Sequence, residues 1–133
     1  MLITGGSGGT YPPGKSAELY HPDRDTPCVL PDLPDQRWLH TQDGSLMCGG
    51  SYTPRSCRRW NPDTGAWDEV TNVTNSLTHE RDEHVSWTPA DGSGTYLMGG
   101  RLSVSTRNNE RTSEIIDTDG NVGSSFSLSY KTE

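Results

Sequence analysis

A short hydrophobic run that ends in Gly-Gly occurs three times in this chain, and this repeat limits the possible folds more than any other feature. The runs are LITGG, LMCGG and YLMGG, which end at Gly6, Gly50 and Gly100, so their spacings are 44 and 50 residues. An R-x-x-H motif precedes the second and third runs, beginning at Arg37 and Arg81. A period of this length indicates one structural unit that is used repeatedly.

Strand-like segments follow each glycine pair in the same phase of the repeat. Residues 16–20, 56–60 and 112–116 alternate polar and apolar side chains, as half-buried strands do, and each segment leads into a turn-forming sequence. We expect strands at residues 2–4, 17–20, 26–30, 39–42, 45–48, 56–61, 66–70, 84–88, 95–98, 111–116 and 122–128.

The composition favours the same fold class. Leu, Ile, Val and Phe make up about 15% of the chain, which is too little for a bundle of long helices. The 15 Gly, four Trp and five Tyr residues suit short twisted strands that are joined by tight turns. No apolar run is long enough for a membrane span, and the net charge of −7 disfavours nucleic acid as a partner. The sequence therefore predicts an all-β chain.

The period and the motifs together resemble the kelch repeat of β-propellers. The similar features are the glycine pair after a hydrophobic strand, the R-x-x-H motif and an aromatic residue, Trp60, seven positions before Trp67. The resemblance implies a fragment of a kelch-type propeller with four-stranded antiparallel blades. It divides the chain into a partial blade (strands two to four) with its linker at 1–38, a blade with its linker at 39–83, and a blade at 84–133. Two positions depart from the pattern: Cys28 stands where the first unit's Trp would be, and residues 120–122 lack an aromatic side chain.

About two and a half blades cannot close a propeller ring, which needs at least about four. Both ends of the sequence are strand-like. We therefore expect either a truncated piece of a larger propeller or a chain that associates with further blades or with copies of itself.

Most of the repeated residues have a structural interpretation. The glycines would turn the chain under a neighbouring blade, where a Cβ atom would clash. The two arginines would pair with backbone groups or with the repeated acids Glu18 and Glu114, although recognition of a carboxylate ligand stays open. The aromatic residues, including Trp87, would pack between blades or form a stacking platform for sugars or bases. This structural set contains Gly5, Gly6, Gly49, Gly50, Gly99, Gly100, Arg37, Arg81, Tyr20, Trp60 and Trp67.

Two other sequence patterns suggest a phosphate-binding loop and a metal site, but the neighbouring residues argue against both. Residues 9–16, GTYPPGKS, match the phosphate-binding loop pattern, but Pro12 and Pro13 have no backbone N–H groups to hold a phosphate, and the segment that follows is strand-like. His40 and His84 occupy equivalent positions in different units, so we expect no metal site from them.

The three cysteines predict one disulfide bond. Cys48 ends one expected strand and Cys57 begins the next, so the two would oppose each other in a hairpin, within reach of a Cys48–Cys57 bridge. Cys28 would then stay free. Together with the glycosylation sequon at residues 72–74, a bridge favours an extracellular location, with a cytoplasmic protein containing free thiols as the alternative.

Basic residues gather in the segments that follow the glycine pairs. Residues 7–17, 51–59 and 101–111 contain seven of the 11 basic residues and a single acid, Glu110. We expect a face there that attracts an acidic peptide or a sulfated glycan. Its candidate residues are Lys15, Arg55, Arg101, Arg107 and Arg111.

The favoured function is a non-catalytic interaction module, without a cofactor, that presents its loops to a protein or glycan partner. The alternative is a fragment of a galactose-oxidase-like copper-radical oxidase, because those enzymes carry kelch-like repeats. Such an enzyme needs Tyr, Cys and His clustered around copper, whereas the repeat places Cys28, Cys48 and Cys57 on different strands.

Overall fold

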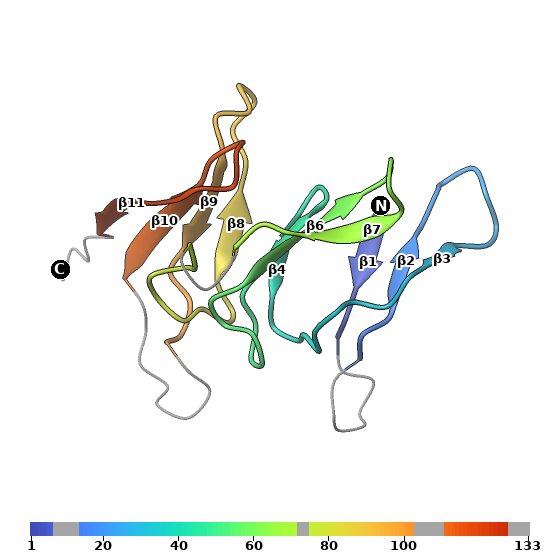
Figure 1. The fold of residues 1–133 in the computed structure, drawn as a ribbon, viewed down its shortest axis with the longest axis horizontal. Helices are drawn as coiled ribbons and strands as arrows, with labels where there is room; N and C mark the ends of the chain where they lie inside the picture. Colours follow the sequence, from blue (N-terminus) through green and yellow to red (C-terminus); the bar gives the residue numbers. More distant parts are fainter. Residues whose placement is uncertain (7–13, 72–74, 103–110, 128–133) are drawn as a thin grey trace, which may run out of the picture.

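The computed structural model of the protein describes residues 1–6, 14–71, 75–102 and 111–127, of which 124–126 are described by their backbone only. Its strands form three antiparallel sheets (Figure 1), and the described residues contain no helix. The first sheet consists of β1 (Leu2–Thr4), β2 (Ala17–Leu19) and β3 (Cys28–Leu30). The second consists of β4 (Thr41–Asp43), β5 (Leu46–Cys48), β6 (Cys57–Asn61) and β7 (Ala66–Glu69). The third consists of β8 (Val85–Trp87), β9 (Thr95–Met98), β10 (Thr112–Ile116) and β11 (Val122–Ser127).

The all-β prediction is confirmed, and each expected strand is present with ends that differ by at most two residues. The largest shift at a strand start in the second sheet is at β4, which begins at Thr41 rather than at Leu39. The expectation that this strand starts at Leu39 is wrong because Leu39 has a φ of 58°. A residue in this left-handed conformation turns the chain and cannot continue a strand.

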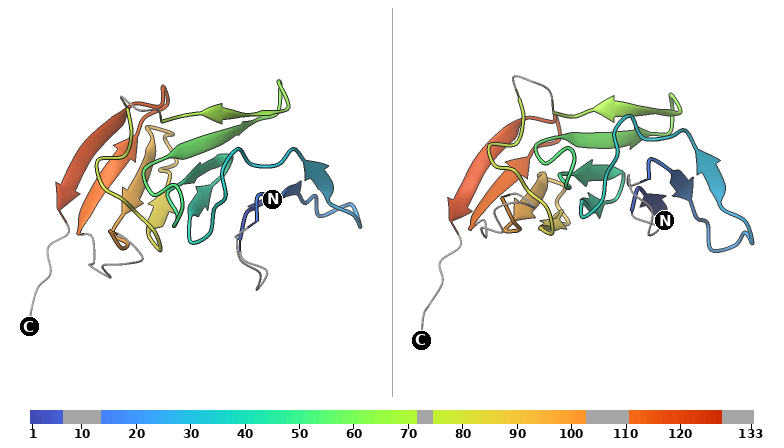
Figure 2. Two further views of the ribbon diagram at one scale, coloured as in Figure 1. Left: turned by 60° about the horizontal axis from the view of Figure 1, so that its bottom comes forward. Right: turned by 90° about the horizontal axis from the view of Figure 1, so that it is seen from below.

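The three sheets lie side by side in an open, curved row (Figure 2). Within each sheet, strands that are neighbours in sequence are hydrogen-bonded neighbours, so each sheet is a simple meander. Contacts between β4 and β8 join the second and third sheets. This order brings the three repeat units into equivalent orientations, and the labelled strands β1 and β9 both run downwards in Figure 1.

The hydrophobic core lies where the second and third sheets meet. Leu46, Cys48 and Cys57 of the second sheet pack with Leu97 and Ile116 of the third, and Leu77 from the connecting segment completes the cluster. All three residues of β5 are buried. Because successive side chains of a strand point to opposite faces, the second sheet is covered on both sides.

The first sheet differs from the other two in one respect. β1 is an edge strand, whereas its equivalents β5 and β9 each pair with a further strand, β4 and β8 respectively. Several apolar side chains of the first sheet are exposed, among them Ile3 (47%) and Val29 (80%), whereas Ala17 is buried. The first sheet therefore lacks, within the described residues, the inner strand that the repeat provides elsewhere.

Candidate functional site: the Arg-His seam

Glycine pairs and R-x-x-H segments alternate along one end of the sheets. We call this arrangement the Arg-His seam and define it as residues 37–40 and 81–84 together with Gly5, Gly6, Gly49, Gly50, Gly99 and Gly100. The Gly6 N–H donates to the Arg37 carbonyl (2.9 Å), and the Gly50 N–H donates to the Arg81 carbonyl (2.8 Å). Each R-x-x-H segment therefore binds the glycine pair of the preceding unit through its backbone.

Gly49 illustrates why the seam requires glycine. Its φ is 67°, and a Cβ atom built on it would lie 2.4 Å from the backbone carbonyl oxygen of Arg81. Neither the conformation nor the space permits a side chain without movement of the backbone. The glycine pairs therefore allow the close approach of one unit to the next.

Arg81 is fully buried and donates to four acceptors of the third sheet. Its Nε lies 2.9 Å from Glu114 Oε2, its Nη1 donates to the carbonyls of Gly99 (2.8 Å) and Thr112 (2.9 Å), and its Nη2 donates to Thr112 Oγ1 (2.8 Å). Glu114, which is 1% exposed, also accepts from the N–H groups of Thr78 and His79. The predicted pairing of Arg81 with backbone groups and with Glu114 is present in the structure.

Arg37 occupies the same position before the second sheet but has no such carboxylate beside it. Its Nη1 donates to the carbonyls of Gly49 and Ser56 (both 2.9 Å), and its Nη2 donates to the Ser56 hydroxyl. Residue 58 of β6, equivalent to Glu114, is an arginine.

Asp35 therefore supplies the negative charge for Arg37, at 3.6 Å from its Nη2, while it also pairs with Arg58 at 3.2 Å. Arg37 Nε has no hydrogen-bond partner among the described residues. Burial lowers the Arg37 pKa to about 10, with Asp35 acting in the opposite direction and Arg58 adding to the decrease. The prediction that Arg37 pairs with backbone groups is confirmed, and its carboxylate partner is Asp35 rather than Glu18.

The two seam histidines each contact the preceding sheet. His40 Nε2 lies 2.9 Å from Thr4 Oγ1, and His84 Nε2 lies 2.7 Å from Thr41 Oγ1. Burial, assisted by the positive charge of the adjacent seam arginine, lowers the pKa of each histidine to about 4. Both imidazoles are therefore neutral at pH 7 and act as hydrogen-bonding groups between sheets.

A repeated backbone turn links the arginine and the histidine of each segment. The third residue of each R-x-x-H motif, Leu39 or Glu83, has a positive φ (58° and 51°). The Glu83 N–H also donates to the Leu39 carbonyl (2.9 Å), which joins the two segments directly. The motif thus encodes a turn that buries the arginine in its own sheet and directs the histidine to the preceding one.

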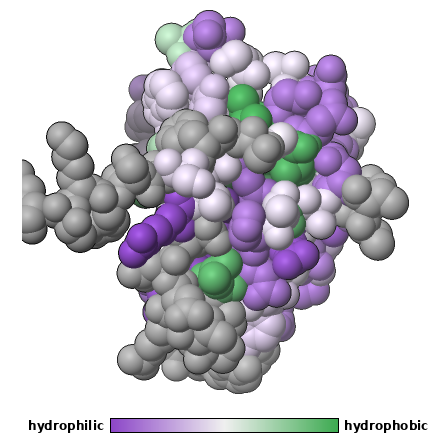
Figure 3. Space-filling model, turned by 90° about the vertical axis from the view of Figure 1, so that its left-hand side faces the viewer, coloured by the Kyte–Doolittle hydropathy of each residue, from purple (hydrophilic) through white to green (hydrophobic). Residues whose placement is uncertain are grey.

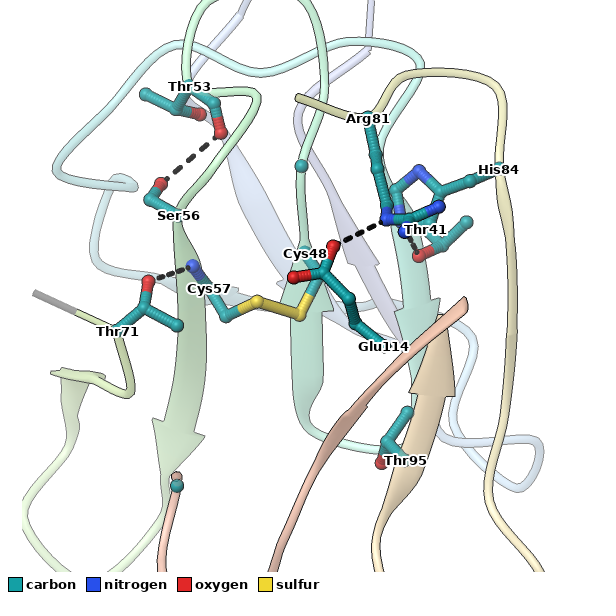
Figure 4. The surroundings of a disulfide bond; sticks show 12 residues. Thr41, Cys48, Thr53, Ser56, Cys57, Thr71, Arg81, His84, Thr95 and Glu114 are labelled. Carbon is teal, nitrogen blue, oxygen red and sulfur yellow. Dashed lines mark hydrogen bonds and ion pairs between the residues drawn. A yellow bond between two sulfur atoms is a disulfide. The ribbon is translucent and has the colours of Figure 1, made fainter. Parts of the chain in front are cut away.

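The predicted disulfide between Cys48 and Cys57 is confirmed. The bridge joins β5 to β6 at a directly opposed pair whose Cα atoms are 4.2 Å apart (Figure 4). Both residues are buried, and the Cys57 N–H donates to Thr71 Oγ1 at 2.7 Å. Cys28 is free and exposed.

The aromatic residues divide into two groups. The rings of Trp60 and Trp67 lie 5.0 Å apart, and Trp67 Nε1 donates to the Pro31 carbonyl of the segment that follows the first sheet. This contact between sheets fits the predicted packing role. Trp87 and Tyr20, in contrast, are 54% and 39% exposed, so the expectation that they pack between sheets is wrong for these two residues. Trp87 packs instead against Tyr96 of the adjacent strand.

The candidate basic residues do not have equivalent surroundings. Arg101 forms ion pairs with the buried Asp82 and with Glu83, which gives it a structural role. Lys15 donates to the Pro34 carbonyl, whereas Arg55 is exposed and lines a hollow of about 410 Å³ with Glu69 and Glu80. Arg111 is exposed, and Arg107 lies outside the described residues.

The sequence did not single out the hydroxyl groups that complete the seam. Ser56 and Thr112 bind the two buried arginines, and Thr4 and Thr41 bind the two histidines. A signal was present for the first pair, because Ser16, Ser56 and Thr112 begin the equivalent segments SAELY, SCRRW and TSEII.

Three further expectations concern individual motifs. The residues after Lys15 form strand β2 rather than a helix, as expected, which removes the helix that a phosphate-binding loop requires. The first part of that motif and the sequon at residues 72–74 lie largely or wholly outside the described residues. Among the residues that the structure describes, no group of three or more His, Cys, Asp or Glu side chains is placed to hold a metal ion.

Comparison of the sequence with protein-family models and with curated proteins finds no match. The described part of the chain has no helix with the length and apolarity required to cross a membrane.

Proposed function

We propose that the chain is part of a kelch-type β-propeller and acts as a non-catalytic interaction module that binds a protein or an anionic glycan through the loops at the seam end of its sheets. The observation that carries this proposal is the repeated use of the seam. In two successive units the arginine binds the glycine carbonyl of its own sheet, and the histidine binds a threonine hydroxyl of the preceding sheet. The histidine contacts join adjacent sheets, as do the bonds from the Gly6 and Gly50 N–H groups to the arginine carbonyls, and blades of a propeller must be joined in this way.

The structure of the seam indicates that a partner would contact the loops rather than the repeated arginines. Arg37 and Arg81 are 0% exposed and donate to groups of their own sheets, so they are not accessible to a partner. Arg55 belongs to the segment between β5 and β6, which leaves from the seam end, and its side chain is exposed. A basic loop at this end would attract an anionic partner, with an affinity that decreases as salt screens the charges.

An extracellular location accompanies this proposal. The buried Cys48–Cys57 bridge is the supporting observation, because disulfides persist mainly in oxidising compartments.

The proposal is tested by retention on immobilised heparin, which serves as the sulfated-glycan probe. The double variant Arg55→Ser, Arg111→Ser should elute at lower salt than the unsubstituted chain. Arg101 is left in place because its loss would remove an ion pair from the buried Asp82 carboxylate. The matched control, Arg24→Ser with Arg59→Ser, removes the same charge from the connection between β2 and β3 and from within strand β6, where the structure places Arg59, and should have a smaller effect. If the two double variants lowered the salt concentration of elution equally, binding would depend on net charge alone, and the proposed face would be overturned.

A further inference from the structure

The first sheet carries a copy of the arginine-binding arrangement that Arg37 and Arg81 fill in the other sheets, and none of the arginines that the structure describes binds to it. In the second and third sheets, the buried guanidinium binds two backbone carbonyls and a hydroxyl: those of Gly49 and Ser56, and those of Gly99 and Thr112. The equivalent groups of the first sheet are the carbonyls of Gly5 and Ser16 and the Ser16 hydroxyl. Backbone geometry supports the equivalence, because Gly5 N–H donates to Ser16 O as Gly49 N–H does to Ser56 O, each at 2.9 Å.

Glu18 supplies the fourth group of this arrangement. It pairs with Ile3 in the register of the first sheet, as Glu114 pairs with Leu97 in the third, so the two carboxylates occupy equivalent positions. Glu114 binds Arg81, whereas no described residue forms a hydrogen bond or an ion pair with the Glu18 carboxylate. We call the set of Gly5, Ser16 and Glu18 the arginine socket.

The edge beside the arginine socket is open to a strand. Within the part of the chain that the structure describes, β1 pairs only with β2. The backbone groups of Leu2 and Thr4 face away from β2, because alternate residues of an antiparallel strand point to opposite sides. A hollow of about 510 Å³ follows this edge and is lined by Met1, Leu2, Ile3, Thr4, Gln42 and Gly44. The Gln42 side chain donates to the Leu2 carbonyl at 2.7 Å and so occupies one hydrogen-bonding position of the edge.

The chain itself indicates what fits there. β4 and β8 occupy the corresponding edges of β5 and β9, and in both cases the buried arginine lies four residues before the first residue of the strand. The strands are three residues long, and their first residues, Thr41 and Val85, pair with Cys48 and Met98 at the position equivalent to Thr4.

We propose that the edge of β1 and the arginine socket form a strand-acceptor site for a separate extended polypeptide segment that carries an arginine four residues before a short strand. The segment would add antiparallel to β1, opposite Thr4 and Leu2, and would displace the Gln42 side chain from the Leu2 carbonyl. Its guanidinium would bind the Gly5 and Ser16 carbonyls, the Ser16 hydroxyl and the Glu18 carboxylate. Main-chain hydrogen bonds would provide affinity, and the buried arginine would provide selectivity. This site is distinct from the proposed loop face and does not depend on it.

A labelled peptide with the sequence of residues 78–88, THERDEHVSWT, is the probe, since it contains Arg81 and β8 in the required spacing. Fluorescence anisotropy should show saturable binding to the chain. Replacement of the peptide's arginine by citrulline, which keeps the shape and removes the charge, should weaken binding about tenfold or more, as expected for loss of a charge-assisted hydrogen-bond pair. This comparison uses the unsubstituted protein and does not depend on the folding of any variant.

Glu18→Gln tests the socket from the other side. It should weaken binding of the arginine peptide about tenfold and leave binding of the citrulline peptide nearly unchanged, because the two changes remove the same interaction. Asp63→Asn, which removes an exposed carboxylate from the turn between β6 and β7, is the matched control and should leave both affinities unchanged. Equal affinity for the two peptides, or absence of binding, would overturn the proposal. Self-association that Glu18→Gln abolishes, without peptide binding, would assign the site to a second copy of the chain and also overturn it.

Discussion

At the scale of single residues, the seam histidines connect stability to pH. The pKa of His40 and of His84 is about 4 in the folded chain, below the value of 6.5 for an unperturbed imidazole. Between these values the unfolded chain binds protons that the folded chain does not. The free energy of unfolding should therefore fall as the pH decreases from about 6.5 to 4, by up to about 1.4 kcal/mol per histidine per pH unit.

Urea unfolding at a series of pH values measures this dependence. His84→Gln should flatten the slope in this range, whereas His21→Gln should not, because the His21 side chain is 58% exposed. Carboxylates also take up protons near pH 4, and the comparison between the two variants separates their contribution from that of the buried imidazole. Identical slopes for His84→Gln and the unsubstituted chain would contradict the proposed role of burial.

Substitution of two glycines with nearly the same conformation distinguishes the cost of backbone strain from the cost of a steric clash. Gly49 and Gly65 have φ values of 67° and 65°, but a Cβ atom would meet the Arg81 carbonyl at 2.4 Å in the first case and nothing within 4 Å in the second. Gly65→Ala should lower the free energy of unfolding by about 1 kcal/mol, the cost of a left-handed alanine. Gly49→Ala should lower it by about 3 kcal/mol or more, because the seam backbone must also move. Equal losses in chemical denaturation would show that the close approach contributes nothing.

At the scale of elements, the disulfide reinforces the hairpin of β5 and β6. The two cysteines are directly opposed and close a short loop, so the bridge restricts the unfolded chain. Its reduction should lower the free energy of unfolding by about 2 to 3 kcal/mol on the loop-entropy estimate. The same hairpin contributes Cys48 and Cys57 to the core, so the bridge supports the contact between the second and third sheets.

A thiol count tests the bridge independently of stability. The denatured, unreduced protein should have one reactive thiol, that of Cys28, and three after reduction. Three reactive thiols without reductant would contradict the bridge. The Cys48→Ala, Cys57→Ala pair should reproduce the stability of the reduced chain, whereas Cys28→Ala, at an exposed position, should change it little.

At the scale of the whole molecule, the open row of sheets leaves the first and third sheets each with a neighbour on one side only. Strand β11 lies at one end of the row and strand β3 at the other, whereas the free edge of β1 lies beside β4 of the second sheet (Figures 1 and 2). On the β11 side, the described residues that can be seen form separate small apolar spots among polar residues (Figure 3). Association through these strand edges would depend on backbone groups as well as on apolar contact.

The chain should accordingly have a β-type circular dichroism spectrum, a broad melting transition and concentration-dependent self-association at micromolar concentration. Sedimentation velocity over a dilution series measures the association. Chemical cross-linking followed by peptide mapping should locate the contacts near β1 and β11 rather than at the seam. A sharply melting monomer over the whole concentration range would contradict the view that these strand edges need further partners.

Local patterns were sufficient to predict the strands, because the information that defines them is local. The 44- and 50-residue spacings of the glycine pairs, the polar–apolar alternation and the turn sequences each act over a few residues, and they located all eleven strands to within two residues. The disulfide followed from the same reasoning, since a hairpin places Cys48 opposite Cys57 through nearest-neighbour pairing alone. The repeat also indicated that backbone groups or the acids Glu18 and Glu114 pair with the two arginines, because these residues recur in phase with the glycines, and Arg81 does bind Glu114.

The tertiary structure decided which partner each repeated residue obtains. Arg37 and Arg81 belong to the same motif, yet Arg58 stands where a glutamate stands in the third sheet, so Asp35, two residues before Arg37, is the acid that pairs with Arg37. The neutral state of His40 and His84 likewise depends on burial between sheets, and the exposure of Trp87 depends on what covers β8. Burial and charge neutralisation depend on contacts between residues that are 30 to 40 positions apart in sequence, such as Arg81 with Glu114 and Thr4 with His40. A local sequence pattern contains no information about which distant residues come into contact.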